Sequence, residues 1–249
     1  MTSPFPPSTA PRSSHADSIK TTLSLDASLA ARLRGRALTA YSSRVDELLL
    51  TALLRALRRL TGGRVVSVAL EGHGRDPELA GELDLGRTVG WFTTLSPVSI
   101  ALSEREDVAL DVKQTKEAVR TRGKGMPELE RWPEIAFNFV DETAPPSELS
   151  PFALIDDVAV GALIAPAAPR WFDLAVLITL RPGGITLELD ADSGRLPVEF
   201  LPALSPAFAA ELELVLSHCE RQEGVEFTPS DVDLPMTLDE LDDVLSGIG

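Results

Sequence analysis

The chain has very few cysteine, histidine and tyrosine residues. Among its 249 residues there is one cysteine, Cys219, which excludes an internal disulfide and a cysteine-rich metal site. It has three histidines and one tyrosine, Tyr41. Only His73 lies in a motif, and no ordered set of acidic or thiol ligands accompanies it. We therefore expect no bound metal.

Basic side chains are also outnumbered, and long apolar runs are absent. The chain has 23 lysines and arginines against 38 aspartates and glutamates, which gives a net charge of −15. This balance argues against nucleic acid and anionic membrane surfaces, because both attract lysine and arginine. No stretch reaches the roughly 18 apolar residues of a membrane span, and the N-terminus lacks a signal peptide's apolar run. We expect a cytoplasmic protein.

The composition divides the chain into a short leader and one domain. Residues 1–20 are rich in proline, serine and threonine, and we expect them to be a disordered leader. The chain as a whole is 44% hydrophobic and 24% charged, which is ordinary for a globular protein. We expect residues 21–249 to form a single folded domain.

Hydrophobic periodicity predicts helices and strands that interleave. Strands are expected at residues 64–70, 97–102, 134–140, 173–181 and 185–190, the last two joined as a hairpin by Pro182-Gly183-Gly184. Residues 141–169 contain several prolines and are expected to be irregular. The order of elements predicts an α/β or α+β fold, in which helices cover a mixed sheet.

The expected helices are identified by their caps and apolar stripes. The first runs from an N-cap at Asp26 to Ala37, the second from residue 43 to residue 60, and the fourth from Ser205-Pro206 to Arg221. The third begins at a capping box of Ser103 and Glu106, and the last begins at a capping box of Thr237 and Glu240. Arg55, Arg58 and Arg59 lie near the end of the second helix, where the helix dipole favours cations.

A predicted strand runs directly into the segment LEGHGR, residues 70–75. Glu71 ends the strand, and a carboxylate at a dry strand end is expected to have a raised pKa, which suits proton transfer. The alternative is a structural carboxylate paired with Arg75. His73 is expected to hydrogen-bond its own loop. Arg75 is expected to pin that loop to a carboxylate such as Asp84, although its planar guanidinium could also bind phosphate.

Twelve residues later comes RTVGWFT, residues 87–93. Gly90 suggests a position where the backbone needs conformational freedom. Trp91 and Phe92 present a large apolar surface, which must either pack in the core or serve as a contact, and Thr93 closes the segment. Core packing is the simpler expectation.

Together these two motifs resemble the second half of an epimerization domain of nonribosomal peptide synthetases, within the condensation-domain superfamily. The similarity continues through YSSRVDELLLTALLRALRRLTGG, RWFDLAVLITL and the closing TPSD segment, about residues 22–245. It implies a single lobe like chloramphenicol acetyltransferase, with a two-layer α+β fold. It also implies a role in the biosynthesis of peptide natural products, which are secondary metabolites.

The resemblance assigns roles to particular residues. Glu71 corresponds to an acid/base at the aminoacyl α-carbon, and the Asn138 amide points toward the reaction cleft. The segment from Gly90 to Thr93 borders the channel for the phosphopantetheine arm of a peptidyl carrier protein, near His73 and Arg75. No directly bound cofactor is implied, because the substrate arrives on that arm.

The chain also departs from this family. The motif HHxxxDG, which supplies the catalytic histidine in the family's first lobe, is absent. Phe139 stands where the family's FNYLG motif has tyrosine, and the turn at residues 122–127 also lacks tyrosine. Activity would therefore require a separate lobe that carries HHxxxDG. Whether the reaction is epimerization or condensation stays open.

Three other interpretations remain. The chain could be a non-catalytic module that docks a carrier protein or an enzyme, with Arg55, Arg58, Arg59 and Arg64 facing an acidic helix. It could be a stand-alone enzyme that uses Glu71 alone, which is demanding for a weakly acidic α-carbon. It could also be a fragment of a larger synthetase, whose exposed apolar face would favour self-association.

Overall fold

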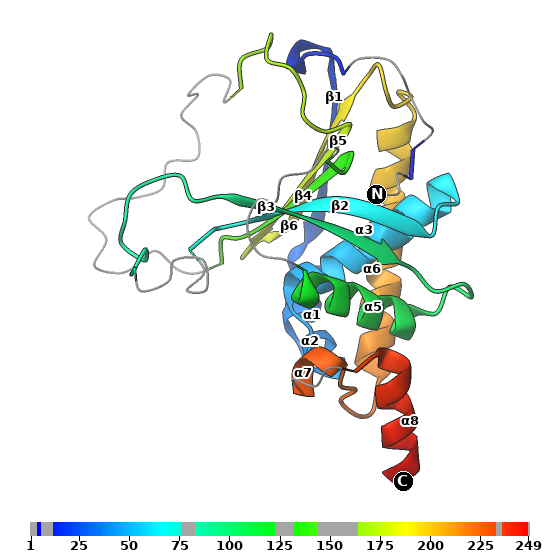
Figure 1. The fold of residues 1–249 in the computed structure, drawn as a ribbon. Coiled ribbons are helices and arrows are strands. Elements are labelled where there is room, and N and C mark those ends of the chain that lie inside the picture. The colour runs from blue at the N-terminus through cyan, green and yellow to red at the C-terminus, as the bar shows by residue number, and fades with distance from the viewer. Residues whose placement is uncertain are drawn as a thin grey trace.

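Six strands form one mixed sheet in the order β1-β6-β5-β4-β2-β3. The structure is a computed structural model that describes residues 4–5, 12–75, 83–122, 132–143, 164–232 and 236–248 (Figure 1). The strands are β1 (Ser18–Asp26), β2 (Val65–Gly72), β3 (Thr94–Ala101), β4 (Ile135–Asp141), β5 (Leu174–Arg181) and β6 (Gly184–Asp192).

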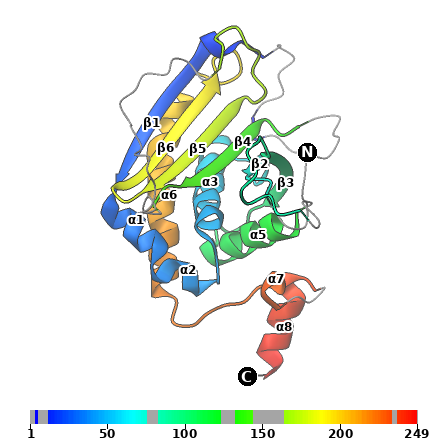
Figure 2. The same ribbon diagram turned by 90° about the vertical axis from the view of Figure 1, so that its left-hand side faces the viewer.

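Helices cover one face of this sheet and leave the other face open among the described residues. The helices are η1 (His15–Asp17), α1 (Ala27–Arg34), α2 (Arg36–Ala40), α3 (Val45–Thr61), α5 (Val108–Thr121), α6 (Phe200–Arg221), α7 (Pro229–Val232) and α8 (Leu238–Ile248). Figure 2 shows α3 and α6 behind the sheet, with its opposite face toward the viewer. This arrangement confirms the predicted two-layer α+β fold with a mixed sheet.

Two parallel pairings at the centre of the sheet make it mixed. Strand β4 runs parallel to both β2 and β5, whereas the remaining neighbours are antiparallel. On β2 the side chains of Val66, Val68 and Leu70 are buried in the main hydrophobic core with those of α3 and α6. Because side chains alternate along a strand, Glu71 points to the open face.

Most of the local predictions are confirmed. The Asp26 carboxylate accepts a hydrogen bond from the Leu29 amide, α3 ends at Gly62 with a φ of 74°, and β5 and β6 form the predicted hairpin. The last helix has its capping box, in which the amides of Thr237 and Glu240 bond to each other's side chains. The first helix, however, ends at Arg34, and α2 starts afresh after Gly35.

Two predicted helix starts are wrong. Helix α6 begins at Phe200, so Pro206 lies inside it. Burial of Leu201 and Leu204 stabilises the additional turn, and proline removes only one backbone donor there. Helix α5 is capped by Asp107, whose side chain accepts from the Leu110 amide. The predicted partner Glu106 has a φ of 58° and lies before the helix.

The predicted leader boundary at residue 20 is also wrong. Strand β1 begins at Ser18, and residues before it bond to carboxylates at the ends of β5 and β6. The Arg12 Nε lies 2.7 Å from the Asp173 carboxylate, and the Ser13 hydroxyl donates to Asp192 over 2.6 Å. Farther back, the buried Phe5 ring meets Phe200 edge-on at 5.5 Å. Composition could not reveal these individual contacts. Leader residues 1–3 and 6–11 lie outside the described ranges.

Of the described helices, α6 alone has the length and apolar composition to cross a membrane. Its apolar stripe of Phe208, Leu212, Val215 and Cys219 is fully buried in the core, as the periodicity predicted. Glu211 lies in the same buried surface and forms ion pairs with two arginines of α3. These features are those of a core helix in a globular domain.

Candidate functional site

Glu71 and Asn138 are 67 residues apart in the sequence, but they meet on neighbouring strands. Strands β2 and β4 pair in parallel with Leu70 opposite Phe137. One residue farther along each strand, Glu71 and Asn138 share the open face. The Asn138 side chain hydrogen-bonds the Glu71 carboxylate. Sequence motifs identified both residues, and the parallel pairing brings them into contact.

The surroundings of Glu71 favour its protonated form. Desolvation is the larger influence and raises the pKa of Glu71, while the hydrogen bond to Asn138 lowers it by less. The pKa therefore lies above its ordinary value, in the direction that the sequence indicated. Because the side chain is exposed on the open face, it remains accessible to a substrate. This combination suits a carboxyl group that takes and returns a proton.

Glu71 borders two cavities, one that extends to residues of α3 and α5 and one on the open face of the sheet. The first, of about 700 Å³, is lined by polar and charged side chains together with a few apolar ones: Arg44, Asp46, His73, Thr93, Arg122, Phe137, Asn138, Phe139 and Asp141. We call it the polar cavity. It brings together four predicted site residues, namely Glu71, His73, Thr93 and Asn138.

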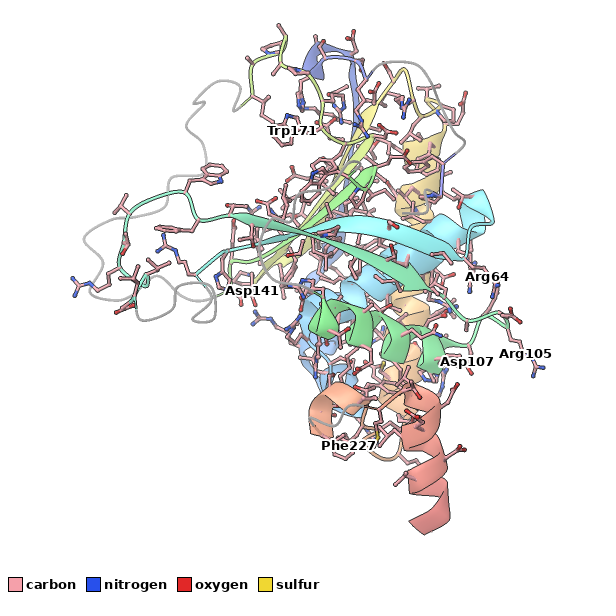
Figure 3. All side chains as sticks on the ribbon, in the orientation of Figure 1. Arg64, Arg105, Asp107, Asp141, Trp171 and Phe227 are labelled. Atoms are coloured by element: carbon pink, nitrogen blue, oxygen red, sulfur yellow. The ribbon has the colours of Figure 1, made fainter. Side chains whose placement is uncertain are left out.

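The second cavity, of about 590 Å³, is mainly apolar, and we call it the apolar cavity. It shares Glu71 and Thr93 with the polar cavity and is otherwise lined chiefly by Trp91, Leu95, Ala136, Ile164, Trp171, Phe172 and Ala175. Figure 3 shows Trp171 on the side of the sheet away from the helices. Neither Trp171 nor His15, which also lines this cavity, was expected at the site: Trp171 lies in the RWFDLAVLITL segment, but the sequence assigned no role to it.

The loops that carry the two motifs pack directly against each other. Gly74 has a φ of 63°, and a Cβ there would lie 1.5 Å from the Phe92 carbonyl oxygen. The His73 Nδ1 accepts a hydrogen bond of 3.0 Å from the Arg75 amide, so this histidine stabilises its own loop as predicted. The two motifs thus form one structural unit at the end of β2.

Arg75 makes contacts other than those predicted. Its guanidinium lies over the Phe92 ring, 4.5 Å from the ring centroid, and bonds to the Leu85 carbonyl oxygen. Asp84 instead accepts a hydrogen bond from the Gly86 amide. The predicted pairing of Arg75 with Asp84 is therefore wrong, because an aromatic face and a carbonyl already hold the guanidinium.

Trp91 does not pack in the core. Its side chain is 89% exposed, so the core-packing interpretation is wrong for this residue. Phe92 is half-buried beneath Arg75. A Cβ at Gly90 would lie 3.0 Å from the Phe92 ring, and its φ is outside the left-handed region. Glycine is needed there for close approach to a ring rather than for an unusual backbone conformation.

Phe139 lies on the wall of the polar cavity, where it presents an apolar ring and no hydroxyl. The chain's one tyrosine cannot replace that hydroxyl. Tyr41 is fully buried in the core, and its hydroxyl hydrogen-bonds the His218 Nε2 at 2.7 Å. The turn at residues 123–127 lies outside the described ranges.

Two of the four arginines suggested for carrier docking, Arg55 and Arg58, are buried, whereas Arg59 and Arg64 are exposed and form ion pairs with Glu211 and Glu104. Arg55 is 3% exposed and forms ion pairs with the buried Asp111 and Glu211. Arg58 is also buried, where it donates to the Ser103 carbonyl oxygen over 2.9 Å. These two side chains hold α3, α5 and α6 together, so they are not available to a partner.

Comparisons with known proteins identify the family and the fold of this chain. The sequence profile of the condensation domain matches residues 1–128. Surfactin synthase subunit 1 of Bacillus subtilis (strain 168) is 32% identical over 224 residues, which cover 83% of this chain and 6% of that protein. Bacitracin synthase 1 of Bacillus licheniformis is 30% identical over 226 residues, 85% of this chain and 4% of that protein.

Solved structures show the same fold. The epimerization domain from the third module of tyrocidine synthetase B matches with a TM-score of 0.74 and 24% identity. The match covers 90% of this chain and 53% of that domain. The chain thus spans about half of the domain and a small fraction of the synthetases. Its sheet and helices form a single chloramphenicol acetyltransferase-like lobe. The chain belongs to the condensation-domain family.

Proposed function

We propose that this chain is one lobe of an epimerization-type active site in peptide natural-product biosynthesis. Its substrate is an aminoacyl or peptidyl thioester on the phosphopantetheine arm of a carrier protein. The observation that carries the proposal is the Glu71–Asn138 pair, which lies where a polar and an apolar cavity meet. Such convergence of a carboxyl group with a raised pKa and a cavity is typical of acid/base sites.

In this proposal Glu71 transfers the α-proton. The carboxylate removes the proton from Cα, and the electrons of the C–H bond move into the thioester carbonyl to form an enolate. Return of a proton to the opposite face inverts the stereocentre, and Glu71 then loses its proton to complete the cycle. A raised pKa makes the Glu71 carboxylate a stronger base. Asn138 holds that carboxylate in place.

Inversion needs a second acid/base on the opposite face of the α-carbon. The family's first lobe supplies a histidine in HHxxxDG, a motif that this sequence lacks. We propose that a second lobe covers the open face of the sheet and brings this histidine opposite Glu71. The exposed ring of Trp91 and the open sheet face are consistent with such a covering partner.

The polar cavity has the chemistry to receive the carrier arm. Its walls include the guanidinium groups of Arg44 and Arg122, the His73 ring and the Asn138 amide. These groups can bind the phosphate and the two amides of phosphopantetheine. Thr93, which borders both cavities, lies where the thioester would pass from the arm toward Glu71.

A direct test combines this chain with a first-lobe protein that carries HHxxxDG. The mixture receives a carrier loaded with an L-aminoacyl thioester, and the released amino acid is analysed on a chiral column. We expect the D isomer to accumulate with the native chain and with Glu223→Gln, which alters an exposed carboxylate just after α6, away from the open sheet face and outside both cavities. The Glu71→Gln variant should lose this activity. Equal racemisation by both variants would refute the assignment of Glu71.

A non-catalytic docking module is the second candidate. Phe139 without its hydroxyl favours it, as does the X-domain from teicoplanin biosynthesis, which has a TM-score of 0.60 and 21% identity and was solved in complex with OxyB. Titration with apo and holo carrier protein, followed by NMR of the Asn138 side-chain amide, separates the two candidates. Entry of the arm shifts this amide with holo carrier alone, whereas surface docking leaves it unchanged with both forms.

A further inference from the structure

The floor of the apolar cavity consists of small side chains. Ala136 on β4 and Ala175 on β5 are directly opposite each other in the parallel register, and both line the cavity. Two alanines side by side leave a hollow in the sheet surface, because larger side chains on these strands would fill it. The volume of about 590 Å³ lies within the usual range for small-molecule sites.

One wall of the cavity is fixed in advance by the N-terminal segment. The amides of His15 and Ala16 donate to the carbonyl oxygens of Ala168 and Pro166 over 3.0 and 2.8 Å, and the Arg170 amide donates to Ser13 over 3.2 Å. These bonds hold the segment at residues 164–172, which carries Trp171 and Phe172. The wall therefore exists without a ligand, which lowers the entropic cost of binding.

A buried cation strengthens the same wall. The Arg170 side chain is 2% exposed, lies 2.7 Å from the Asp190 carboxylate and donates to the Asp190 carbonyl oxygen over 3.0 Å. This arginine immediately precedes Trp171, whose ring is 69% exposed at the cavity. The anchored backbone thus exposes the Trp171 indole to solvent. Covering this indole with an apolar group removes apolar surface from water, which favours binding.

Trp91 also lines the cavity. Its loop is held by the packing of Gly74 on the Phe92 carbonyl and by Arg75 on the Phe92 ring. The loop that carries Trp91 is therefore also held in place, and its side chain is 89% exposed. Two exposed indoles on anchored loops, above a floor of alanine, make a site with the shape and polarity for an apolar group.

We propose that this cavity binds the side chain of the residue being epimerized and selects thioesters with a large apolar or aromatic side chain. This inference rests on the proposed function. With the arm in the polar cavity and the side chain in the apolar cavity, the α-carbon lies at their junction, beside Glu71. Ala136 and Ala175 set the depth of the site, and Trp91 and Trp171 pack against the bound side chain.

The test uses NMR of the full chain with nitrogen-15 in its indoles. The chain has three tryptophans, and Trp132 lines neither cavity, so its indole N–H is an internal control. The probes are pantetheine and its phenylalanyl, glycyl and glutamyl thioesters. We expect the phenylalanyl thioester to shift the indoles of Trp91 and Trp171 and to bind roughly tenfold to a hundredfold more tightly than the glycyl thioester.

A variant that fills the floor tests the geometry. Ala175→Leu should abolish the preference for the phenylalanyl thioester and leave glycyl binding unchanged. Ala101→Leu, an exposed alanine on β3 outside both cavities, is the matched control and should keep the preference. If Ala175→Leu unfolds the chain, Trp171→Ala replaces it and should also lose the preference.

The outcomes separate this inference from the proposed function. Equal affinity for the phenylalanyl and glycyl thioesters, or the absence of an indole shift, overturns the inference about the apolar cavity. In either case a shift of the Asn138 amide on addition of pantetheine still supports entry of the arm. Absence of that shift contradicts arm entry, and therefore the proposed function, even where the indoles respond.

Discussion

At the scale of single residues, the site depends on the carboxyl group of Glu71, whose pKa two influences shift in opposite directions. Desolvation raises the pKa of Glu71, and Asn138 moderates the rise. The sequence indicated the direction of this shift because an apolar strand precedes Glu71. It did not indicate the contact with Asn138, since that contact depends on the pairing of β2 with β4. It also gave the wrong partner for Arg75, because partner choice follows from loop geometry.

Replacement of Asn138 by leucine should raise the pKa of Glu71 further. The side-chain amide stabilises the ionised carboxylate, so its loss favours the protonated form. Carbon-13 NMR of the Glu71 carboxyl group during a pH titration measures the change. An unchanged or lower pKa in Asn138→Leu would show that the amide does not stabilise the charge.

The same shift links Glu71 to the pH dependence of stability. The folded pKa lies above the unfolded value, so folding is favoured while the group is protonated. Stability is lost as the pH rises from the unfolded pKa through the folded pKa. Glu71→Gln removes this loss and should gain stability relative to the native chain between acidic and neutral pH. Urea denaturation at several pH values measures the gain, and a constant difference contradicts the linkage.

Gly74 should be intolerant of a side chain. Its positive φ and the Phe92 carbonyl leave no space for a Cβ, so Gly74→Ala should destabilise the chain by more than about 1 kcal/mol. Gly183→Ala is the control, because a Cβ there has no atom within 4 Å. Urea denaturation compares the two variants. Equal free energies of unfolding would contradict the close packing of the two motifs.

At the scale of elements, periodicity predicted five of the six described strands, all but β1, and most helices, whereas their exact starts depended on tertiary contacts. Leu201 and Leu204 extend α6 past a proline, and Asp107 takes the cap from Ser103. The ion pairs of the α3 arginines also depend on tertiary contacts that the sequence does not show. Their position near a helix end is visible in the sequence, but the acidic partners come from α5 and α6.

Arg55 should therefore be essential for packing of α3 against α5 and α6. Arg55→Leu leaves Asp111 and Glu211 buried without this partner and should cost about 3–5 kcal/mol. Arg64 pairs with Glu104 at the surface, so the control Arg64→Leu should cost no more than about 1 kcal/mol. Thermal and urea unfolding compare the two. Similar losses would contradict the proposed packing role of Arg55.

At the scale of the whole molecule, the part of the chain that the structure describes covers one face of the sheet with helices and leaves the other open, with Trp91, Ile164 and Trp171 exposed around one cavity. A surface of this kind favours association when its partner is absent. We expect the isolated chain to self-associate, and Trp91→Ser with Trp171→Ser to reduce this. Phe227→Ser, near α7 and far from Trp171 in Figure 3, should not. Sedimentation velocity that gives equal association for both variants contradicts this account.

The central claim is that Glu71 moves the α-proton of a thioester, and deuterium incorporation tests it most directly. The chain, a lobe that carries HHxxxDG and an aminoacyl carrier protein are mixed in D2O, and mass spectrometry follows deuterium at Cα. We predict incorporation with the native chain and with Glu223→Gln, and a decrease of roughly a hundredfold or more with Glu71→Gln. Deuterium incorporation by Glu71→Gln at the native rate would contradict the account.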